Sequence, residues 1–220
     1  MSKSLYVFDM DETLFSADCS MLWNAFLVEQ GIVSSDDFIK EDQRLMALYS
    51  AGELDMEDYL AFAMSPLLDM DKSEVNELVE KCVTEQVMPR FYPQAKALIE
   101  QLNNKGTKTI VISATVNFIV KAVAKRIGVN TAMGIDLVVK GQCYTREIEG
   151  IPTYRQGKVE RLNQWLLEQE TSYDDIHFYT DSINDLPLCE RADRVYLVNP
   201  CPQLLAHAGR PNWQTLNWTL

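Results

Sequence analysis

The sequence predicts an α/β fold in which a doubly wound parallel sheet is interrupted, soon after its first strand, by an all-helical insertion. Short apolar runs rich in β-branched residues alternate with amphipathic segments, a pattern typical of parallel strands with helices on both faces. The segment 16–87 breaks this alternation, because it holds few β-branched runs and many helix-forming residues. We therefore expect an α/β core domain of residues 1–15 and 88–220, and a helical cap domain of residues 16–87.

Four segments have the length and composition of buried strands, and three of them end at or just before polar side chains. They are Leu5–Phe8, Thr109–Ser113, Ile176–Thr180 and Val195–Val198; the fourth is likewise followed by a polar residue, Asn199. A further region, 137–148, alternates weakly around Lys140-Gly141, so we expect a hairpin or two short strands there.

The expected helices place their apolar residues on one face. In the core they cover Gln94–Asn103, Val116–Ile127 and Lys158–Gln169, and a glycine stop signal follows the first two. In the insertion the same spacing predicts a helix around Trp23 that ends by Gly31, and three more over Asp37–Tyr49, Met56–Met64 and Lys72–Cys82. The insertion is therefore expected to form a compact helical module.

The acidic character of the chain is confined to the insertion. The formal net charge is −12 for 220 residues; segment 16–87 carries 16 acidic against 4 basic residues, and the remainder carries 16 of each. Such a surface repels the phosphates of DNA and RNA, so nucleic-acid binding is disfavoured. Two interpretations of the charge stay open: a solvated helical surface, or a field that discourages polyanions and accepts a substrate with a cationic group.

Cysteine usage and hydropathy narrow the class of protein further. The five cysteines are scattered and form no C-x-x-C pair, which argues against a disulfide framework or structural zinc and favours a cytoplasmic location. Two histidines are too few for a histidine-rich metal site. Neither a membrane span nor a signal peptide is expected, because Asp9 interrupts the first apolar run and no later run is long enough. A monomer and a homodimer are both compatible with the sequence.

The most informative feature is a pair of carboxylates at the end of the first strand. Asp9 and Asp11 are two positions apart, so their side chains point to the same side if the strand continues. Unpaired buried carboxylates are costly, and open α/β sheets bind ligands at the carboxyl ends of their strands. We therefore expect a cation or solvent beside this pair.

Three further polar groups are expected at the same edge of the sheet. They are Ser113-Ala114-Thr115 at a strand–helix junction, Lys158 behind Gly157, and the run Asp181–Asp185. Alone, each has an ordinary structural explanation, such as a helix N-cap, a surface lysine or a turn. Together they set four carboxylates against one lysine, an imbalance that a hard divalent cation such as Mg2+ removes. The hydroxyls, a helix N-terminus and the lysine suit phosphate.

The spacing of these groups resembles the motifs of the haloacid dehalogenase superfamily. Asp9-x-Asp11-x-Thr13, Ser113, Lys158 and Asp181-Ser-x-x-Asp185 carry the resemblance, which covers nearly the whole chain. The helical insertion resembles the phosphoserine-phosphatase-like branch, as do the stretch 18–27 and the tail Val198-Asn199-Pro200. The chain departs from the pattern at Glu12, where many members have Gly, Ser or Asn.

The resemblance implies a magnesium-dependent phosphomonoesterase. Asp9 would be the nucleophile that forms an aspartyl-phosphate, and Asp11 the general acid and base. Mg2+ would be held by Asp9, the backbone carbonyl of Asp11, Asp181 and water. Phosphoryl oxygens would be bound by Ser113, Ala114 and Lys158.

Supporting and cap residues follow from the same resemblance. Thr13 is expected to orient Asp11, and Asn184 and Asp185 to brace the metal and the lysine. In the cap, the resemblance suggests Asp18 as a contact for a substrate amino group and Arg44 as a contact for a carboxylate. Alternatively, Asp18 caps its helix and Arg44 pairs with a surface acid.

The implied substrate is a small phosphorylated metabolite, with phosphoserine or another amino-alcohol phosphate favoured. Histidinol phosphate, a sugar phosphate and a lipid head-group phosphate stay open.

Other functional classes also stay open at this point. A response-regulator receiver combines acids, a hydroxyl, a lysine and an aspartyl-phosphate, but receivers carry adjacent acids on the first strand and their phosphoacceptor on a later one. They also lack a helical insertion of this size. A non-catalytic binding protein of the same fold and a phosphotransferase that uses a second alcohol instead of water are the remaining alternatives.

Overall fold

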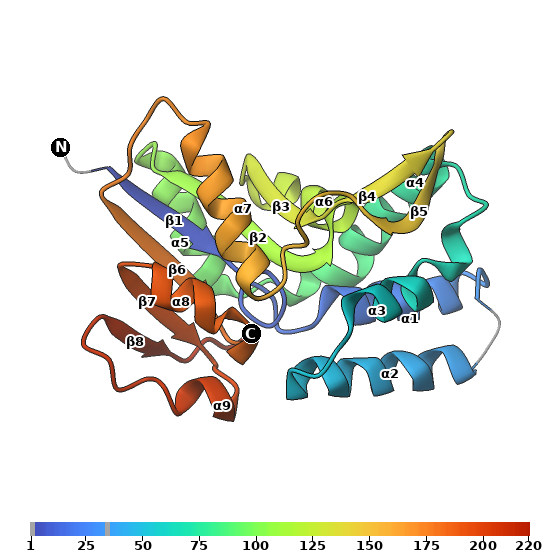
Figure 1. Ribbon diagram of the computed structural model, residues 1–220, viewed down its shortest axis with the longest axis horizontal. Coiled ribbons are helices and arrows are strands. Elements are labelled where there is room, and N and C mark those ends of the chain that lie inside the picture. Colours follow the sequence, from blue (N-terminus) through green and yellow to red (C-terminus); the bar gives the residue numbers. More distant parts are fainter. Residues whose placement is uncertain (1–2, 34–35) are drawn as a thin grey trace.

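The computed structural model describes residues 3–33 and 36–220, and its centre is a six-stranded sheet (Figure 1). The strand order is β3-β2-β1-β6-β7-β8, and all neighbouring strands are parallel. The strands are β1 (Ser4–Phe8), β2 (Lys108–Val116), β3 (Thr131–Ile135), β6 (Asp175–Thr180), β7 (Arg194–Val198) and β8 (Trp213–Leu216). Because β1 pairs with both β2 and β6, the residues that follow it reach the middle of the sheet edge.

Helices cover both faces of the sheet, as the predicted doubly wound fold requires. The core helices are α5 (Pro93–Asn104), α6 (Asn117–Ile127), α7 (Gln156–Leu167), α8 (Leu186–Arg191) and α9 (Pro202–Leu205). α5 and α6 pack on one face and α7 and α8 on the other (Figure 1). The residues of β1 divide between these layers: Phe8 packs with α5 and α6, and Val7 with α7 and α8. The α/β fold class is therefore confirmed.

Between β1 and α5 the chain forms the helical insertion. Its helices are α1 (Cys19–Glu29), α2 (Asp36–Ala51), α3 (Met56–Ala63) and α4 (Lys72–Cys82), with shorter helical turns at Ser65–Leu67, Val83–Val87 and Met88–Arg90. The chain leaves and re-enters the core at neighbouring points, because Phe15 forms an antiparallel bridge with Phe91 and their rings stack at 5.0 Å. Helical structure thus continues beyond the expected boundary at Val87, as far as Arg90.

Two helices of the cap, α1 and α4, pack against helix α6 of the core domain. Trp23 of α1 meets the ring of Phe118 of α6 edge-on at 6.3 Å. Arg126 of α6 donates to Glu80 of α4 at 2.6 Å and to Thr84 at 2.9 Å. A continuous apolar interior therefore runs from one face of the sheet into α1 and α4.

The predicted hairpin is confirmed, and it lies against the cap (Figure 1). Its antiparallel strands are β4 (Leu137–Lys140) and β5 (Cys143–Ile148). Cys143 forms an antiparallel bridge with Asp71, and the N–H of Lys72, the first residue of α4, donates to the carbonyl of Gln142 at 2.8 Å. The β4–β5 hairpin of the core domain is therefore joined to the cap by backbone contacts at the start of α4.

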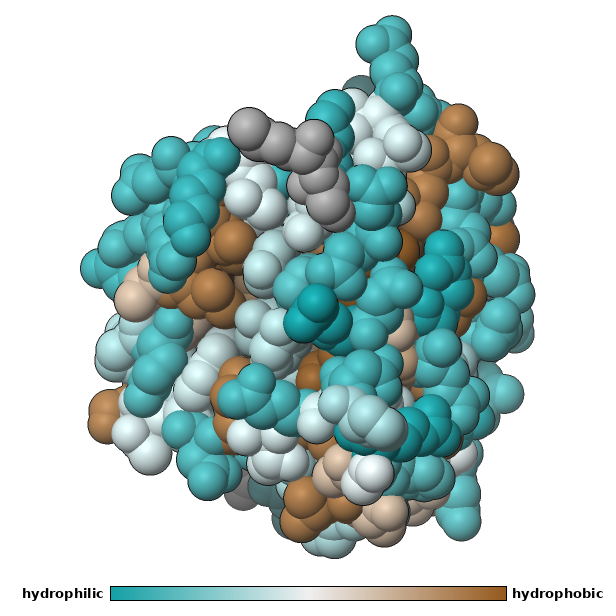
Figure 2. All heavy atoms as spheres, turned by 90° about the vertical axis from the view of Figure 1, so that its left-hand side faces the viewer, coloured by the Kyte–Doolittle hydropathy of each residue, from teal (hydrophilic) through white to brown (hydrophobic). Residues whose placement is uncertain are grey.

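The prediction of four sheet strands was incomplete, because β3 and β8 form the two edges of the sheet. The side of the molecule seen in Figure 2 is mostly hydrophilic, with apolar residues in separate patches. Across residues 3–33 and 36–220, the helices fall short of the length and apolar character that crossing a membrane requires.

Candidate active site

The two carboxylates of the first motif follow β1 directly and are held by a tight turn. The N–H of Asp9 still donates to the Tyr179 carbonyl of β6 at 2.9 Å, and the N–H of Leu14 returns to the Met10 carbonyl at 2.9 Å. Within this turn Glu12 has a φ of 55°, in the left-handed region. A residue with a Cβ is strained there by about 1–2 kcal/mol. Glycine would relieve that strain, which gives the departure at Glu12 a physical cost.

Lys158 is the buried counter-charge of the Asp9 carboxylate. Its Nζ lies 2.7 Å from Asp9 Oδ1 and 2.7 Å from Asp185 Oδ1, and all three side chains are buried. Thr180 donates to the other oxygen of Asp185 at 2.7 Å. Burial alone lowers the pKa of Lys158, but the carboxylates of Asp185 and Asp9 outweigh it and raise that pKa. Lys158 therefore stays a cation and holds Asp9 in place.

A tight turn before α7 delivers Lys158 to this position. A Cβ on Gly157 would lie 1.9 Å from the carbonyl oxygen of Pro152, so only glycine fits the turn. The hydroxyl of Thr153 donates to the carbonyl of Ser113 at 2.5 Å. The turn is thereby tied to β2, the strand that carries the hydroxyl motif.

Asp181 reaches the same place from the end of β6. The hydroxyl of Thr13 donates to Asp181 Oδ1 at 2.8 Å and lies 3.5 Å from Asp9 Oδ2, so it reaches both carboxylates. Burial and the charge of Asp9 raise the pKa of Asp181 well above its ordinary range. The expectation that Thr13 orients Asp11 is wrong, because the turn after β1 directs this hydroxyl toward β6.

The carboxylate of Asp11 faces the hydroxyls at the end of β2. Its Oδ2 accepts from Ser113 at 2.8 Å and from Thr115 at 2.9 Å. Its Oδ1 accepts from the N–H of Cys19, the first residue of α1, at 2.7 Å. Asp11 thus lies between the end of β2 in the core and the N-terminus of α1 in the cap.

The donor set at these strand ends fits a hard divalent cation. Burial raises the pKa of Asp9, Lys158 lowers it, and the carboxylates of Asp185 and Asp11 raise it further. A cation bound by Asp9 and Asp181 would relieve this repulsion, and oxygen ligands suit Mg2+. Among the described residues, no three His, Cys, Asp or Glu side chains form a metal cage. A Mg2+ site here would draw on the carboxylates of Asp9 and Asp181 together with carbonyl and water oxygens.

Two hollows lie above the strand ends and share part of their lining. The outer hollow, of 250 Å³, opens over Asp9 and Asp181, and the inner hollow, of 30 Å³, reaches between the cap helices. Both are lined by Asp11, Asp18, Met46 and Tyr49. The inner hollow adds Ser20, Leu54, Met56, Tyr59, Ala114 and Thr115. Its cap side is mostly apolar and aromatic.

The Asp18 side chain caps helix α1 and also lines both hollows. Its Oδ1 accepts from the N–H of Met21 at 2.9 Å, so the helix-capping alternative is confirmed. The same side chain lines both hollows. Burial and the charge of Asp11 raise the pKa of Asp18 well above its ordinary range.

Two expected site residues point away from the carboxylates. Arg44 lies on an exposed surface of α2, pairs with Glu41 at 2.7 Å, and is outside the lining of both hollows. Asn184 is near the site, but its amide faces the cap and donates to the Tyr49 carbonyl at 2.9 Å. Tyr49 and Arg155, which meet Asn184 here, belong to no sequence motif and were missed.

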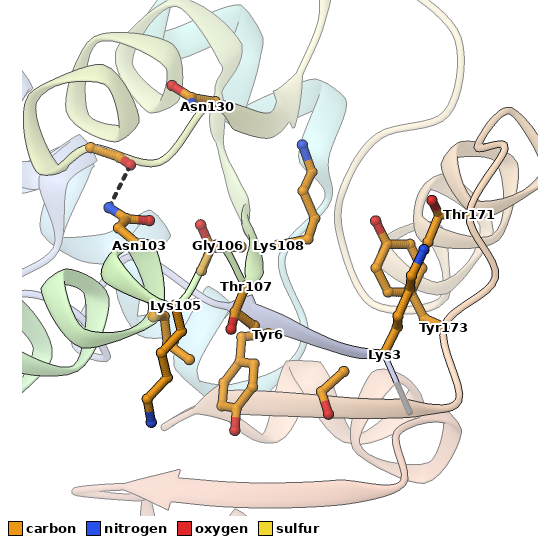
Figure 3. A pocket seen from close by; sticks show the side chains of 14 residues that line it. Lys3, Tyr6, Asn103, Lys105, Gly106, Thr107, Lys108, Asn130, Thr171 and Tyr173 are labelled. Atoms are coloured by element: carbon orange, nitrogen blue, oxygen red, sulfur yellow. Dashed lines mark hydrogen bonds between the residues drawn. The ribbon is translucent and has the colours of Figure 1, made fainter. Parts of the chain in front are cut away.

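A third hollow, at the opposite end of the strands, has different chemistry. It measures 910 Å³, and among its described lining residues there are three lysines and no acid. The lysines do not converge: in Figure 3 Lys105 and Lys108 point in opposite directions, and Lys108 lies 5.5 Å over the ring of Trp165. The described lining of this hollow therefore lacks the converging charged groups that lie at the carboxyl ends of the strands.

The comparisons with known proteins agree with this geometry. The family model of haloacid dehalogenase-like hydrolases matches residues 6–190. Histidinol-phosphatase of Neisseria meningitidis serogroup C (strain 8013) is 33% identical over 220 residues, which cover 98% of this chain and 99% of that protein. A solved protein of unknown function from Bordetella pertussis Tohama I has a TM-score of 0.89 and 30% identity, with 98% of this chain and 99% of that chain covered.

A phosphoserine phosphatase solved as a phospho-aspartyl intermediate analogue shows the same fold. Its TM-score is 0.71 at 22% identity, with 95% of this chain and 92% of that chain covered. The match along residues 6–190, together with the strand-end carboxylates around Lys158, shows that the chain belongs to the haloacid dehalogenase-like hydrolase family.

Proposed function

We propose that this chain is a Mg2+-dependent phosphatase that hydrolyses a small phosphomonoester through an aspartyl-phosphate on Asp9. The observation that carries the proposal is the setting of the Asp9 carboxylate. One oxygen is held by Lys158 at 2.7 Å, the other lies 3.5 Å from the hydroxyl of Thr13, and the side chain lines the outer hollow. A fixed, buried carboxylate at the floor of an open hollow is suited to nucleophilic attack.

The reaction is proposed to use Asp9 and Asp11 in two steps. The Asp9 carboxylate attacks phosphorus, the ester P–O bond breaks, and the leaving alkoxide takes a proton from Asp11. Asp11 then removes a proton from water, whose oxygen attacks the aspartyl-phosphate. The acyl-phosphate P–O bond breaks, Asp9 returns to a carboxylate and inorganic phosphate is released.

Three groups are proposed to hold the phosphoryl oxygens during both steps. Lys158 supplies a fixed positive charge, and Ser113 and the backbone of Ala114 lie at the end of β2 beside Asp11. A bound phosphoryl group would compete with Asp11 for the Ser113 hydroxyl. Mg2+, held by Asp9, the Asp11 carbonyl and Asp181, would neutralise charge on the phosphoryl group.

The charge of the hollows favours an amino-alcohol phosphate without a carboxylate. Asp18 lines both hollows, Glu12 lines the outer one, and their described lining includes no Lys or Arg. An ammonium group would find a partner in Asp18, whereas the carboxylate of phosphoserine would meet acids and no cation. Histidinol phosphate carries an amine and an imidazole ring, for which Tyr49 and Tyr59 offer aromatic surface. The name of the 33% identical Neisseria protein points to the same compound.

The test is a comparison of kcat/KM for histidinol phosphate, phosphoserine and a sugar phosphate in the presence of Mg2+. We expect histidinol phosphate to lead by about tenfold or more, the scale of one charged hydrogen bond. Asp18→Asn should remove that lead and leave p-nitrophenyl phosphate hydrolysis unchanged. Asp55→Asn is the matched control, because Asp55 caps α3 in the same way but lies outside both hollows.

The outcomes separate the two parts of the proposal. Equal kcat/KM for phosphoserine and histidinol phosphate would reject the substrate preference. Failure to hydrolyse any phosphomonoester with Mg2+ present would reject the phosphatase itself.

A further inference from the structure

One arginine joins the cap to the catalytic loops. Arg155, in the turn before α7, donates from Nη2 to the carbonyl of Gly52 at the end of cap helix α2. Its Nε donates to Asn184 Oδ1, in the loop after β6, at 3.2 Å. A cation at the C-terminal end of a helix is favourable, because the last carbonyls carry partial negative charge.

Asn184 strengthens the same connection from the core side. Its side chain is 4% exposed, and its amide donates to the carbonyl of Tyr49 in the last turn of α2 at 2.9 Å. The hydroxyl of Tyr154 donates to Asn184 Oδ1 at 3.4 Å, and the rings of Tyr49 and Tyr154 are 5.6 Å apart. Two carbonyls at the end of α2 are therefore held by core side chains.

The backbone on both sides is shaped for this contact. Gly52 has a φ of 74°, and a Cβ there would lie 2.9 Å from Arg155 Nη2, so glycine leaves the space that the guanidinium fills. Arg155 itself has a φ of 51° and a ψ of −121°. A residue with a side chain keeps such a conformation only where its surroundings over-determine it, and such strain gathers at functional sites.

The connection fixes a side chain that faces the catalytic carboxylates. Tyr49 lines both hollows. Burial, followed by the charges of Asp185 and Asp9, raises the pKa of Tyr49 well above its ordinary range. The segment 153–158 also contacts Ser113 through Thr153 and Asp9 through Lys158. One short turn therefore links the phosphate-side hydroxyl, the nucleophile and the cap.

We propose that Arg155 is a positioning residue that ties the end of α2 to the loop after β6 and so holds this part of the cap in place beside the hollow over Asp9. The kinetic part of this proposal rests on the phosphatase function proposed above, and the structural part does not. Loss of the guanidinium should free the end of α2 and weaken substrate binding.

The structural test is amide hydrogen exchange of the intact protein without substrate. Arg155→Gly removes the guanidinium and relieves the positive φ, so a loss of folding is not expected. Exchange in the last turn of α2 and at Gly52 and Glu53, whose N–H groups close that turn, should rise by about tenfold or more. Arg210→Ala is the control, because Arg210 lies over the ring of Trp213 as Arg155 lies over that of Tyr154, and its other partner, Glu190, is away from the cap.

The kinetic test measures KM and kcat for p-nitrophenyl phosphate with Mg2+ in the same variants. In Arg155→Gly we expect KM to rise by about tenfold, more than kcat falls, with the melting temperature close to that of Arg210→Ala. Local exchange in α2 together with raised KM supports the proposal. Unchanged exchange in α2, exchange raised equally along the whole chain, or an unchanged KM overturns it.

A double-mutant cycle tests the contact itself. Gly52→Ala places a Cβ 2.9 Å from Arg155 Nη2 and should raise exchange in α2 on its own. In the Arg155→Gly background the clash partner is gone, so the same change should have a smaller effect. Strictly additive effects would show that Gly52 acts through its backbone alone and would overturn the contact. If wild-type protein hydrolyses no phosphomonoester, the exchange measurements still decide whether the connection exists.

Discussion

The floor of the site and the wall that faces it are built in different ways. The catalytic floor, which we define as Asp9, Asp11, Ser113, Lys158 and Asp181, is polar and tied by hydrogen bonds of 2.7–2.8 Å. The cap wall, which we define as Asp18, Met46, Tyr49, Leu54, Met56 and Tyr59, is mostly apolar or aromatic. Under the proposed function, the difference teaches that the floor would carry out the reaction, whereas the wall would select the substrate.

The cap is also attached to the core in two different ways. α1 and α4 share an apolar interior with α6, and such packing resists small displacements. The end of α2, which carries Tyr49, is held by polar contacts from Arg155 and Asn184. We therefore expect changes in the floor to act on every substrate, and changes near α2 to act on binding.

The largest effect is expected from Asp9→Asn in the catalytic floor. Without the proposed nucleophile, kcat should fall by about 1,000-fold or more for every phosphomonoester, because the proposed covalent step is lost. The fold should persist, since burial and neighbouring carboxylates already raise the Asp9 pKa and the neutral amide avoids their repulsion. Phosphate release and thermal melting measure the two parts. Near-normal turnover would show that another group attacks phosphorus.

Removal of divalent metal should come next in size. Exhaustive EDTA treatment should abolish phosphatase activity, and added Mg2+ should restore it. Added Mg2+ should also raise the melting temperature, because a ligand that binds the folded state stabilises it. Asp181→Asn should weaken that thermal response while the fold remains. Full activity after chelation would contradict a metal in the floor.

A backbone change beneath the floor should have an intermediate effect. Gly157→Ala places a Cβ 1.9 Å from the Pro152 carbonyl oxygen, so the turn must shift and carry Lys158 with it. A displacement of about 1 Å can cost about 100-fold in rate, so a loss of kcat on that scale is expected for all substrates. Gly209→Ala is the control, because its Cβ would meet no described atom within 4 Å. If kcat is equal in the two variants, the turn at Gly157 does not determine the position of Lys158, and the prediction is wrong.

The smallest effect concerns the stability of the cap and its dependence on pH. Asp42 of α2 is 2% exposed and accepts from Asn24 of α1 at 2.7 Å, and burial raises its pKa from 3.8 to about 6 despite that bond. The folded state therefore keeps a proton that the unfolded state loses, and stability falls as pH rises from about 4 to about 6.

Asp42→Asn should remove this cost. At pH 8 the variant should melt about 3 °C higher than wild type, which corresponds to about 1 kcal/mol for a chain of this size. At pH 4 the two proteins should melt at similar temperatures, because both then carry a neutral group. A larger gain at pH 4 than at pH 8 would reverse the predicted sign.

The elements with strong periodic patterns could be predicted from the sequence, and those that depend on tertiary contacts could not. The helix predicted over Lys72–Cys82 begins and ends at those residues, because a capping box with Glu74 marks its start. β3 was missed because Gly134 interrupts its pattern. In the structure a Cβ at Gly134 would lie 2.7 Å from Asn117 Cα, so this glycine permits the close approach of β3 and α6. No local sequence pattern predicts such a contact between segments.

In the site, too, sequence spacing predicted which residues lie close together but not the direction of each side chain. Strand ends and motif spacing predicted that Asp9, Lys158 and Asp181 would meet, because parallel strands bring their carboxyl ends to one edge. The direction of each side chain could not be read in this way. Thr13 donates to Asp181 instead of Asp11, and Asn184 faces the cap. These side-chain directions depend on packing between segments that are far apart in the sequence.

The β4–β5 hairpin has a consequence for chimeric proteins. Exchanging only the segment between β1 and α5 with that of a relative would replace α4 but leave the hairpin behind. The backbone bond from Lys72 to Gln142 and the bridge between Asp71 and Cys143 would then join segments of different origin. A graft that moves specificity between members of the family should therefore carry residues 137–148 together with the helices.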